Sequence, residues 1–308
     1  MRTKNRLRLM GFLIMLLAVR CTAQKPEGAA PPPTQDSTAR PGVAVSVEDD
    51  VPYASVNGTE LRLDIYAPAE RGREARPAVV LIHGGGWTSF DKGTMRGMGD
   101  FLARAGFVAF SVDYRLFHDG QNRWPAQLDD VQRAVRWVRS NAARYGVDPE
   151  RIGAFGHSAG GQLAALLGME NTRDNSDRAL ASYSSRVEAV VDVSGPSDFT
   201  TERDPDGETF LRNFLGADRA KDPAIWRQAS PVFQVEKSDA PFLIVHGTQD
   251  QNVPIGQAQE LVDKLGAAGV PVTFVKLEDV HTFRTPEARR ALAMNTLAFF
   301  RRYLAVPN

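Results

Sequence analysis

Cysteine is nearly absent from the sequence, since Cys21 is the only one among 308 residues. A disulfide within the chain needs two cysteines, so none can form, and the stability of the fold must come from its core. An excess of charge of either sign is absent as well, because 37 Lys and Arg residues balance 37 Asp and Glu residues. A chain without net charge has no overall field that attracts nucleic acid or an anionic membrane. We therefore expect no nucleic-acid partner and a small or neutral substrate.

The usual signatures of cofactor binding are missing too. The five histidines form no His-Glu-x-x-His pattern of the kind that binds zinc. The glycine run at 84–86 is not followed by the Lys-Ser or Lys-Thr pair of a phosphate-binding loop. These absences predict that the protein needs neither a metal nor an organic cofactor.

The N-terminus has the pattern of an export signal. Basic residues within positions 2–8 precede an apolar run at 9–19 that is too short for a permanent membrane span. We expect a signal peptide over 1–23 and then, over 24–42, a disordered linker rich in Pro, Ala, Thr and Gln. A buried N-terminal helix is the alternative, but the composition of the linker disfavours it.

Two cleavage sites compete at the end of this signal. Cleavage after Ala23 is favoured by the small residues at 21–23. Cleavage before Cys21 would create a lipidated N-terminus, but Arg20 departs from the small residue that lipoprotein signals prefer. We therefore expect an exported protein, periplasmic or extracellular, which is anchored to a membrane only if Cys21 carries a lipid. No signal for a particular oligomeric state is present.

Residues 43–308 have the pattern of one α/β domain. Short apolar runs alternate with longer stretches of helical period, which is typical of βαβ units around a mostly parallel sheet. The long amphipathic helix predicted over 128–138 has Pro125 in its first turn, and others are predicted over 258–265 and 292–304. The predicted strands are 62–66, 78–82, 107–112, 152–155, 189–193, 242–245 and 272–277.

The segment 199–230 interrupts this alternation. It is charged, contains several prolines and glycines, and carries aromatic side chains at partly helical spacing. Ligand sites in open α/β sheets lie beyond the carboxyl ends of the strands, so an insertion here would cover such a site. We expect it to form a small lid.

The strongest catalytic motif is Gly-His-Ser-Ala-Gly at 156–160. It directly follows the strand predicted at 152–155 and precedes an apolar helix at 163–167. A serine on a sharp strand-to-helix turn is held close to neighbouring backbone, so the flanking positions need glycine. The motif alone occurs by chance in many proteins, but this context predicts that Ser158 is a nucleophile.

A second motif, His-Gly-Gly-Gly-Trp at 83–87, follows the strand predicted at 78–82. A glycine-rich turn exposes backbone N–H groups that can donate to the oxyanion of an acyl-transfer intermediate. We expect the oxyanion hole to consist of the N–H groups of Gly85, Gly86 and Ala159, the residue after the nucleophile. A plain glycine turn or a phosphate loop is the alternative.

The general base must be one of the five histidines, because imidazole exchanges protons near neutral pH. His157 belongs to the elbow and would point away from the serine, whereas His83 suits a structural hydrogen bond. His246 ends a strand and His118 lies in a polar loop. His281 follows the last predicted strand and agrees with the order serine, acid, histidine, so we predict that it is the base.

The base needs a carboxylate that fixes its tautomer and stabilises its charged form. Asp250 lies in the loop after the strand predicted at 242–245, and we expect it to be this acid. Asp198, in the loop after the preceding strand, is the alternative. Glu278 and Asp279 are too near His281 in the sequence to reach round its ring easily.

Together these motifs resemble the esterase and lipase branch of the α/β-hydrolase superfamily, notably hormone-sensitive-lipase-like esterases and the bifunctional feruloyl and acetylxylan esterase group. The resemblance spans about 56–304 and also includes Leu-Asp-Ile-Tyr at 63–66, Asp-Tyr-Arg at 113–115 and Trp-Pro-Ala-Gln at 124–127. It implies an α/β-hydrolase fold with a mostly parallel central sheet flanked by helices. It also implies hydrolysis of carboxylic esters through an acyl-enzyme, with acetylated or feruloylated plant polysaccharide as the natural substrate.

Few aromatic side chains are available to contact such a substrate. The candidates are Trp87, Phe199, Phe214 and Trp226, each of which is also a good core residue. A long lipid chain would need more apolar lining than these provide. We therefore expect short-acyl or aryl esters, either small molecules or part of a polysaccharide.

Two other functions occur on related folds. A serine peptidase or amidase of the prolyl-oligopeptidase kind uses similar elbow chemistry, but usually carries a large propeller before the hydrolase domain, whereas only 1–42 precede it here. A non-catalytic binding protein typically lacks one residue of the triad, and this chain has all three. We therefore predict an exported serine esterase.

Overall fold

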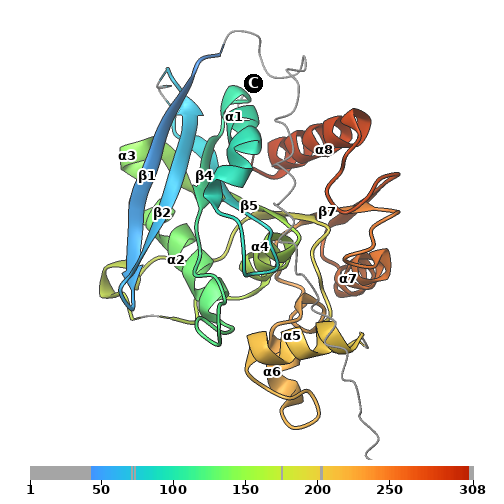
Figure 1. Cartoon of the computed structure of the whole chain (residues 1–308). Coiled ribbons are helices and arrows are strands. Elements are labelled where there is room, and N and C mark those ends of the chain that lie inside the picture. Colours follow the sequence, from blue (N-terminus) through green and yellow to red (C-terminus); the bar gives the residue numbers. More distant parts are fainter. Residues whose placement is uncertain (1–42, 71, 73, 175, 202–203, 305–308) are drawn as a thin grey trace, which may run out of the picture. The chain divides into compact units, whose positions relative to one another are not determined.

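The computed structural model describes residues 43–304 except 71, 73, 175, 202 and 203 (Figure 1). The predicted signal peptide and linker at 1–42, with Cys21, lie outside the described residues and stay predictions. Of the helices in the described part of the chain, none is both long and apolar enough to cross a membrane.

The centre of the fold is one sheet, in which the strands lie in the order β1-β2-β4-β3-β5-β6-β7-β8. β2 is antiparallel to both of its neighbours, and all pairs from β4 to β8 are parallel. The strands are β1 (Val45–Val56), β2 (Thr59–Pro68), β3 (Arg76–Ile82), β4 (Val108–Val112), β5 (Val147–His157), β6 (Ala189–Val193), β7 (Phe242–Gly247) and β8 (Val272–Leu277).

The central strands are buried on both sides. Every residue of β4, β6 and β7 is buried. Parallel strands that are covered by helices need apolar side chains on both faces, so their sequences are continuous apolar runs and not alternating ones. Such runs are visible in the sequence, and each predicted strand overlaps an observed one.

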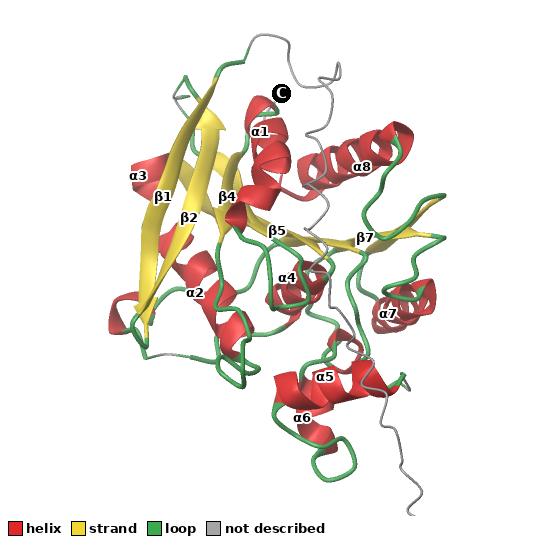
Figure 2. Ribbon diagram, in the orientation of Figure 1, coloured by secondary structure: helices red, strands yellow, loops and turns green. Residues whose placement is uncertain are grey.

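Helices cover both faces of this sheet (Figure 2). On one face α1 and α8 pack together, and their Leu102 and Phe300 belong to one apolar cluster. On the other face lie α2, α4 and α7, which contribute Val135, Leu166 and Leu261 to a second cluster. The helices are α1 (Arg96–Arg104), α2 (Ala126–Ser140), α3 (Ala142–Tyr145), α4 (Ala159–Met169), α5 (Pro205–Leu215), α6 (Pro223–Gln228), α7 (Ile255–Ala268) and α8 (Pro286–Leu304).

The sequence pattern does not predict β1 or α1. β1 buries only Val51 and Tyr53 completely, so it contains no apolar run that would reveal it. One detail of α2 is also wrong in the prediction: Pro125 is the residue before the helix and does not lie in its first turn. The missing N–H of proline costs nothing at either position, so the pattern could not distinguish them.

The segment 199–230 contains α5 and α6, which lie between β6 and β7 in the chain. The Asp204 carboxylate accepts from the first N–H groups of α5, and Gly216 ends this helix in the left-handed conformation. Phe214 of α5 stacks on Trp87, with ring centroids 4.8 Å apart. The segment is therefore tied to the loop that follows β3, and its action as a lid stays a prediction.

Candidate active site

Ser158 lies between the end of β5 and the start of α4, where its backbone has φ 56° and ψ −121°. This conformation is sparsely populated for a residue with a side chain. The positions two residues before and two residues after Ser158 have no space for a side chain. A Cβ on Gly156 would overlap the carbonyl oxygen of Gly160. A Cβ on Gly160 would in turn overlap the carbonyl oxygens of Ile82 and His83, so α4 can approach β3 only because this position is glycine.

Three of the predicted residues form one hydrogen-bonded chain. The Ser158 hydroxyl lies 2.8 Å from His281 Nε2, and His281 Nδ1 donates to Asp250 Oδ2 at 2.7 Å. The three residues come from loops after β5, β8 and β7. Parallel strands end at one edge of the sheet, so loops that are far apart in the sequence meet there. The structure thus joins nucleophile, base and acid by the hydrogen bonds that these roles require, and the roles themselves stay predictions.

Asp250 is only 8% exposed, and its carboxylate lies among hydrogen-bond donors. Oδ1 accepts from the backbone N–H groups of Asn252 at 2.8 Å and Val253 at 2.9 Å, while Oδ2 lies 3.2 Å from His246 Nε2. Burial alone would raise the pKa of Asp250, but hydrogen bonds from His246, His281 and Val253 lower this pKa well below its usual range. The carboxylate is therefore ionised at neutral pH, as stabilisation of an imidazolium requires.

The alternative acid, Asp198, is engaged elsewhere. Its Oδ1 accepts from both the N–H and the hydroxyl of Thr200, each at 2.7 Å. The partner of His281 Nδ1 is Asp250. The geometry therefore favours Asp250 over Asp198 as the orienting carboxylate.

His157, the residue before the nucleophile, supports the loop of the base. Its Nε2 donates to the carbonyl oxygen of His281 at 3.0 Å, and the centroids of the two rings are 5.1 Å apart. Burial, and secondly the neighbouring His281, lower the pKa of His157 to about 4, so the ring is neutral at neutral pH. The sequence predicts only that this ring points away from the serine; its contact with His281 is a finding of the structure.

The glycine loop after β3 touches the elbow at Gly84. A Cβ on Gly84 would lie 2.9 Å from the carbonyl oxygen of His157 and 3.2 Å from the Cβ of Ser158. Such spacing is tighter than ordinary contact, so a side chain here would push the loop away from the nucleophile. The glycine run therefore holds its backbone beside the reacting hydroxyl.

The predicted oxyanion donors are free to bind a ligand. Gly85 and Gly86 have φ of 102° and 58°, which glycine adopts without strain. Ala159 is the first residue of α4, so its N–H has no partner within the helix. Across the described ranges, the N–H groups of Gly85, Gly86 and Ala159 donate to no protein acceptor. Their role as an oxyanion hole stays a prediction that this arrangement supports.

A buried tyrosine fixes the start of this loop. The Tyr114 hydroxyl lies 3.0 Å from the carbonyl oxygen of His83 and 3.2 Å from that of Gly84, and can donate to either. The Tyr114 ring stacks on His83, with centroids 4.2 Å apart. Burial lowers the pKa of His83 to about 4, and its Nδ1 donates to the Gly84 carbonyl at 2.7 Å. His83 thus makes the structural hydrogen bond that the sequence predicts.

A buried glutamine connects the elbow helix to both neighbouring loops. Gln162 of α4 accepts from Trp87 Nε1 at 3.2 Å and donates to the carbonyl oxygen of Ala229 at 2.8 Å. Its side chain is fully buried, so both hydrogen bonds form away from water, where an unpaired amide would be costly. Gln162 therefore couples the glycine loop to the end of the segment 199–230.

The side chains predicted to bind substrate are buried. Phe199, Phe214 and Trp226 have no exposed surface, and Trp87 is 6% exposed. Phe199 meets Trp87 edge to face at 5.5 Å between centroids. Three of the four candidates therefore act as core residues in this structure, and contact with a substrate would require the segment 199–230 to move.

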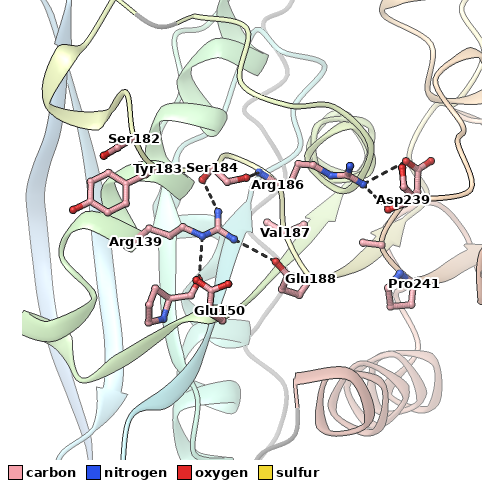
Figure 3. Close-up of a pocket in the computed structure, with 13 residues that line it drawn as sticks. Arg139, Glu150, Ser182, Tyr183, Ser184, Arg186, Val187, Glu188, Asp239 and Pro241 are labelled. Atoms are coloured by element: carbon pink, nitrogen blue, oxygen red, sulfur yellow. Dashed lines mark hydrogen bonds and ion pairs between the residues drawn. The ribbon is translucent and has the colours of Figure 1, made fainter.

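A hollow of about 720 Å³ lies elsewhere, among residues that precede β6 and β7 and therefore at the opposite edge of the sheet (Figure 3). Its two arginines are already engaged. Arg139 donates to the carbonyl oxygens of Pro149 and Ser184, and Arg186 lies 3.6 Å from Asp239. The hollow is separate from the triad. No group of three or more metal-ligating side chains occurs within the described ranges, and the expectation that no cofactor is needed stays a prediction.

Sequence reasoning missed the contacts of several residues around the triad. Gln162 has one possible signal, a polar side chain within an apolar helix. Tyr114 belongs to the Asp-Tyr-Arg motif at 113–115, but neither its contact with the glycine loop nor that of His246 with the loop after β7 can be read from the sequence. Sequence reasoning therefore finds the residues of the proposed triad but not the contacts that support them.

The mostly parallel sheet and the serine elbow with its histidine and aspartate at one edge define the esterase branch of the α/β-hydrolase superfamily. Solved structures of esterases share this fold, which confirms the fold class expected from the sequence. Within this branch the chain belongs to the BD-FAE family, whose model matches residues 63–265.

Among curated relatives, Esterase LipC of Mycobacterium tuberculosis is 31% identical over 67% of this chain and 52% of its own. Dipeptidyl aminopeptidase BIII of Pseudoxanthomonas mexicana is 29% identical over 72% of this chain and 32% of its own. The chain thus spans about half the length of the first of these relatives and a third of the second.

Two solved structures are similar over most of the chain. A truncated carbohydrate esterase from gut microbiota has a TM-score of 0.75 and 29% identity, and the match covers 85% of this chain and 97% of that one. The esterase Est2 of Thermogutta terrifontis with bound propionate has a TM-score of 0.73 and 28% identity, and covers 87% and 97%.

Proposed function

We propose that this protein is an exported serine hydrolase that cleaves short-acyl or aryl carboxylic esters through an acyl-enzyme. The observation that carries the proposal is the hydrogen-bonded chain Ser158–His281–Asp250. This arrangement supports activation of the Ser158 hydroxyl next to a glycine loop whose N–H groups could bind an oxyanion.

The reaction follows from the positions of these groups. His281 Nε2 takes the proton of the Ser158 hydroxyl while Ser158 Oγ bonds to the ester carbonyl carbon. The carbonyl oxygen becomes negative and accepts from the N–H groups of Gly85, Gly86 and Ala159. The bond to the alcohol then breaks, and the alcohol leaves with the proton from His281. Water repeats the two steps on the acyl-enzyme and releases the acid, while ionised Asp250 stabilises each imidazolium.

The acyl group is proposed to be short. Trp87, Phe199 and Phe214 fill the space beside the elbow with one another, which leaves little apolar surface for a long chain. The alcohol is proposed to be a sugar of a plant polysaccharide such as acetylated xylan. Support comes from the similarity to a carbohydrate esterase and to an esterase that binds propionate. Export is proposed from the pattern at 1–23.

Amide hydrolysis is the second candidate, favoured by the similarity to a dipeptidyl aminopeptidase. That relative is about three times longer than the shared region, so most of its length lies outside the similarity. Ester hydrolysis stays the first candidate because Esterase LipC and both solved structures described above are esterases.

A substrate panel with Ser158→Ala as the blank tests this function. The panel contains acetyl, butyryl, long-chain and feruloyl esters, acetylated xylan and prolyl-amide peptides. We expect the wild type to be fastest on acetyl or feruloyl esters and Ser158→Ala to lose at least about 10³-fold in kcat/KM. Cleavage of the amides alone would instead establish a peptidase, and silence on the whole panel would contradict both.

A further inference from the structure

His246 is a fully buried imidazole at the end of β7 that the proposed reaction does not use. Its Nε2 lies 2.8 Å from the carbonyl oxygen of Val253 and 3.2 Å from Asp250 Oδ2. Both of these oxygens can only accept, so Nε2 carries a proton and donates toward them. The other nitrogen, Nδ1, is buried without a hydrogen-bond partner in the described part of the chain.

A buried imidazole with one unpartnered nitrogen costs more free energy than an apolar side chain of the same size. The polar contacts of the His246 ring are therefore made by Nε2 and not by Nδ1. The Nε2 atom has the Val253 carbonyl oxygen as its hydrogen-bond partner and also lies 3.2 Å from Asp250 Oδ2, the oxygen that receives the N–H of the proposed base His281 at 2.7 Å. Both histidines therefore lie close to the same carboxylate oxygen.

A closed set of contacts results. Val253 donates its N–H to Asp250 Oδ1 and offers its carbonyl oxygen to His246, so the loop after β7 is held by the ring and by the carboxylate at once. Oδ1 of Asp250 accepts from two backbone N–H groups and Oδ2 accepts from His281, while His246 Nε2 lies 3.2 Å from Oδ2. We propose that His246 is a positioning residue that fixes Asp250 and weakens its pull on His281, a role that rests on the proposed hydrolase reaction.

Other charged groups also act on this ring. Asp192 of β6 and His157 at the end of β5 both interact electrostatically with His246, besides Asp250 of its own loop and His281 after β8. Removing the Nε2 donor breaks the hydrogen bond to the Val253 carbonyl oxygen and removes the N–H next to Asp250 Oδ2. The loop of Asp250 is then held less firmly, and its less compensated carboxylate stabilises the protonated base more strongly.

The decisive variants of His246 differ in whether they keep an N–H donor at the position of Nε2. His246→Gln keeps an N–H near the Nε2 position, whereas His246→Asn is too short to reach Asp250 and His246→Met has no donor. We expect His246→Gln to stay within about threefold of the wild type in kcat. His246→Asn and His246→Met should lose about tenfold in kcat with little change in KM, since the substrate does not touch this ring.

The pH profile supplies a readout that simple loss of packing would not move. In His246→Asn and His246→Met the low-pH limb of kcat/KM should move to higher pH by about half a unit or more, because protonated His281 is better stabilised. His246→Gln should keep the wild-type limb. His118→Met, the same replacement in an exposed loop, is the control for substitution as such and should change neither value.

Proton NMR gives a second readout that needs no substrate. The low-field resonance of the His281 Nδ1 proton should be present in the wild type and in His246→Gln, and shifted or broadened in His246→Asn. Equal losses in all three variants, or a wild-type profile and resonance in His246→Asn, would overturn the proposal. If the wild type hydrolyses nothing in the panel, the proposed function fails, while the NMR comparison still decides the role of His246.

Discussion

At the scale of single residues, the choice between two aspartates has a sharp consequence. Asp250→Asn should lower kcat by about 10³–10⁴-fold, because an amide in place of the carboxylate neither fixes the tautomer of His281 nor stabilises its charge. Asp198→Asn should keep kcat within about threefold of the wild type. Asp198 accepts from Thr200, and the hydrogen-bond partner of His281 Nδ1 is Asp250. Steady-state kinetics on a short ester measure both variants. The reverse ranking would show that Asp198 is the acid.

The three residues that meet in the proposed triad could be predicted because each has a local signal. Ser158 sits between obligatory glycines, and His281 and Asp250 follow apolar strands in the expected order. His246 and Gln162 have no such signal. Their roles depend on the atoms opposite them, Asp250 Oδ2 for His246 and Trp87 Nε1 for Gln162, which only the folded chain brings into reach.

At the scale of elements, the close packing of α4 against β3 is the feature that holds the nucleophile beside the glycine loop. Gly160→Ala should lower the free energy of unfolding by about 2–4 kcal/mol, because the added Cβ would overlap the backbone of Ile82 and His83. Activity should fall with it, since relief of the overlap moves Ser158. Chemical denaturation and ester hydrolysis measure the two effects.

Gly266→Ala is the matched control for this prediction. Gly266 lies in α7, and a Cβ there meets nothing within 4 Å. Alanine has the higher helix propensity, so this variant should gain about 0.5–1 kcal/mol in the free energy of unfolding. A comparable loss at both glycines would mean that the packing of α4 does not explain the effect at Gly160.

The same scale shows why some elements escaped prediction. β3, β4 and β6 are covered on both faces, so their apolar sequences identify them. β1 pairs only with β2 at the edge of the sheet and is mostly exposed, so it lacks the continuous apolar run of a strand buried on both faces. Pairing through backbone hydrogen bonds does not require an apolar run. β1 therefore could not be recognised from its sequence.

At the scale of the whole molecule, the fold lowers the pKa of one buried acid, Asp250, and raises the pKa of another, Asp192. Hydrogen bonds keep Asp250 charged, whereas Asp192 on β6 is 2% exposed and accepts from the Gly195 N–H at 2.9 Å. Burial raises the pKa of Asp192 to about 6, although nearby His246 and the Gly195 N–H act in the opposite direction. Burial of this carboxyl therefore makes the stability of the protein depend on pH.

Because the pKa of Asp192 is higher in the folded than in the unfolded chain, its protonated form favours folding at low pH. This contribution is lost as the pH rises through about 6, where the folded protein must hold a buried charge. Asp192→Asn keeps the oxygen that binds Gly195 and removes the charge. Relative to the wild type, its free energy of unfolding should rise by up to about 3 kcal/mol between about pH 4 and about pH 7.

Urea denaturation across this range measures the difference in the free energy of unfolding. The control is Asp263→Asn on the exposed surface of α7, which should stay within about 0.5 kcal/mol of the wild type at every pH. A difference between Asp192→Asn and the wild type that does not change with pH would mean that folding does not raise the pKa of Asp192.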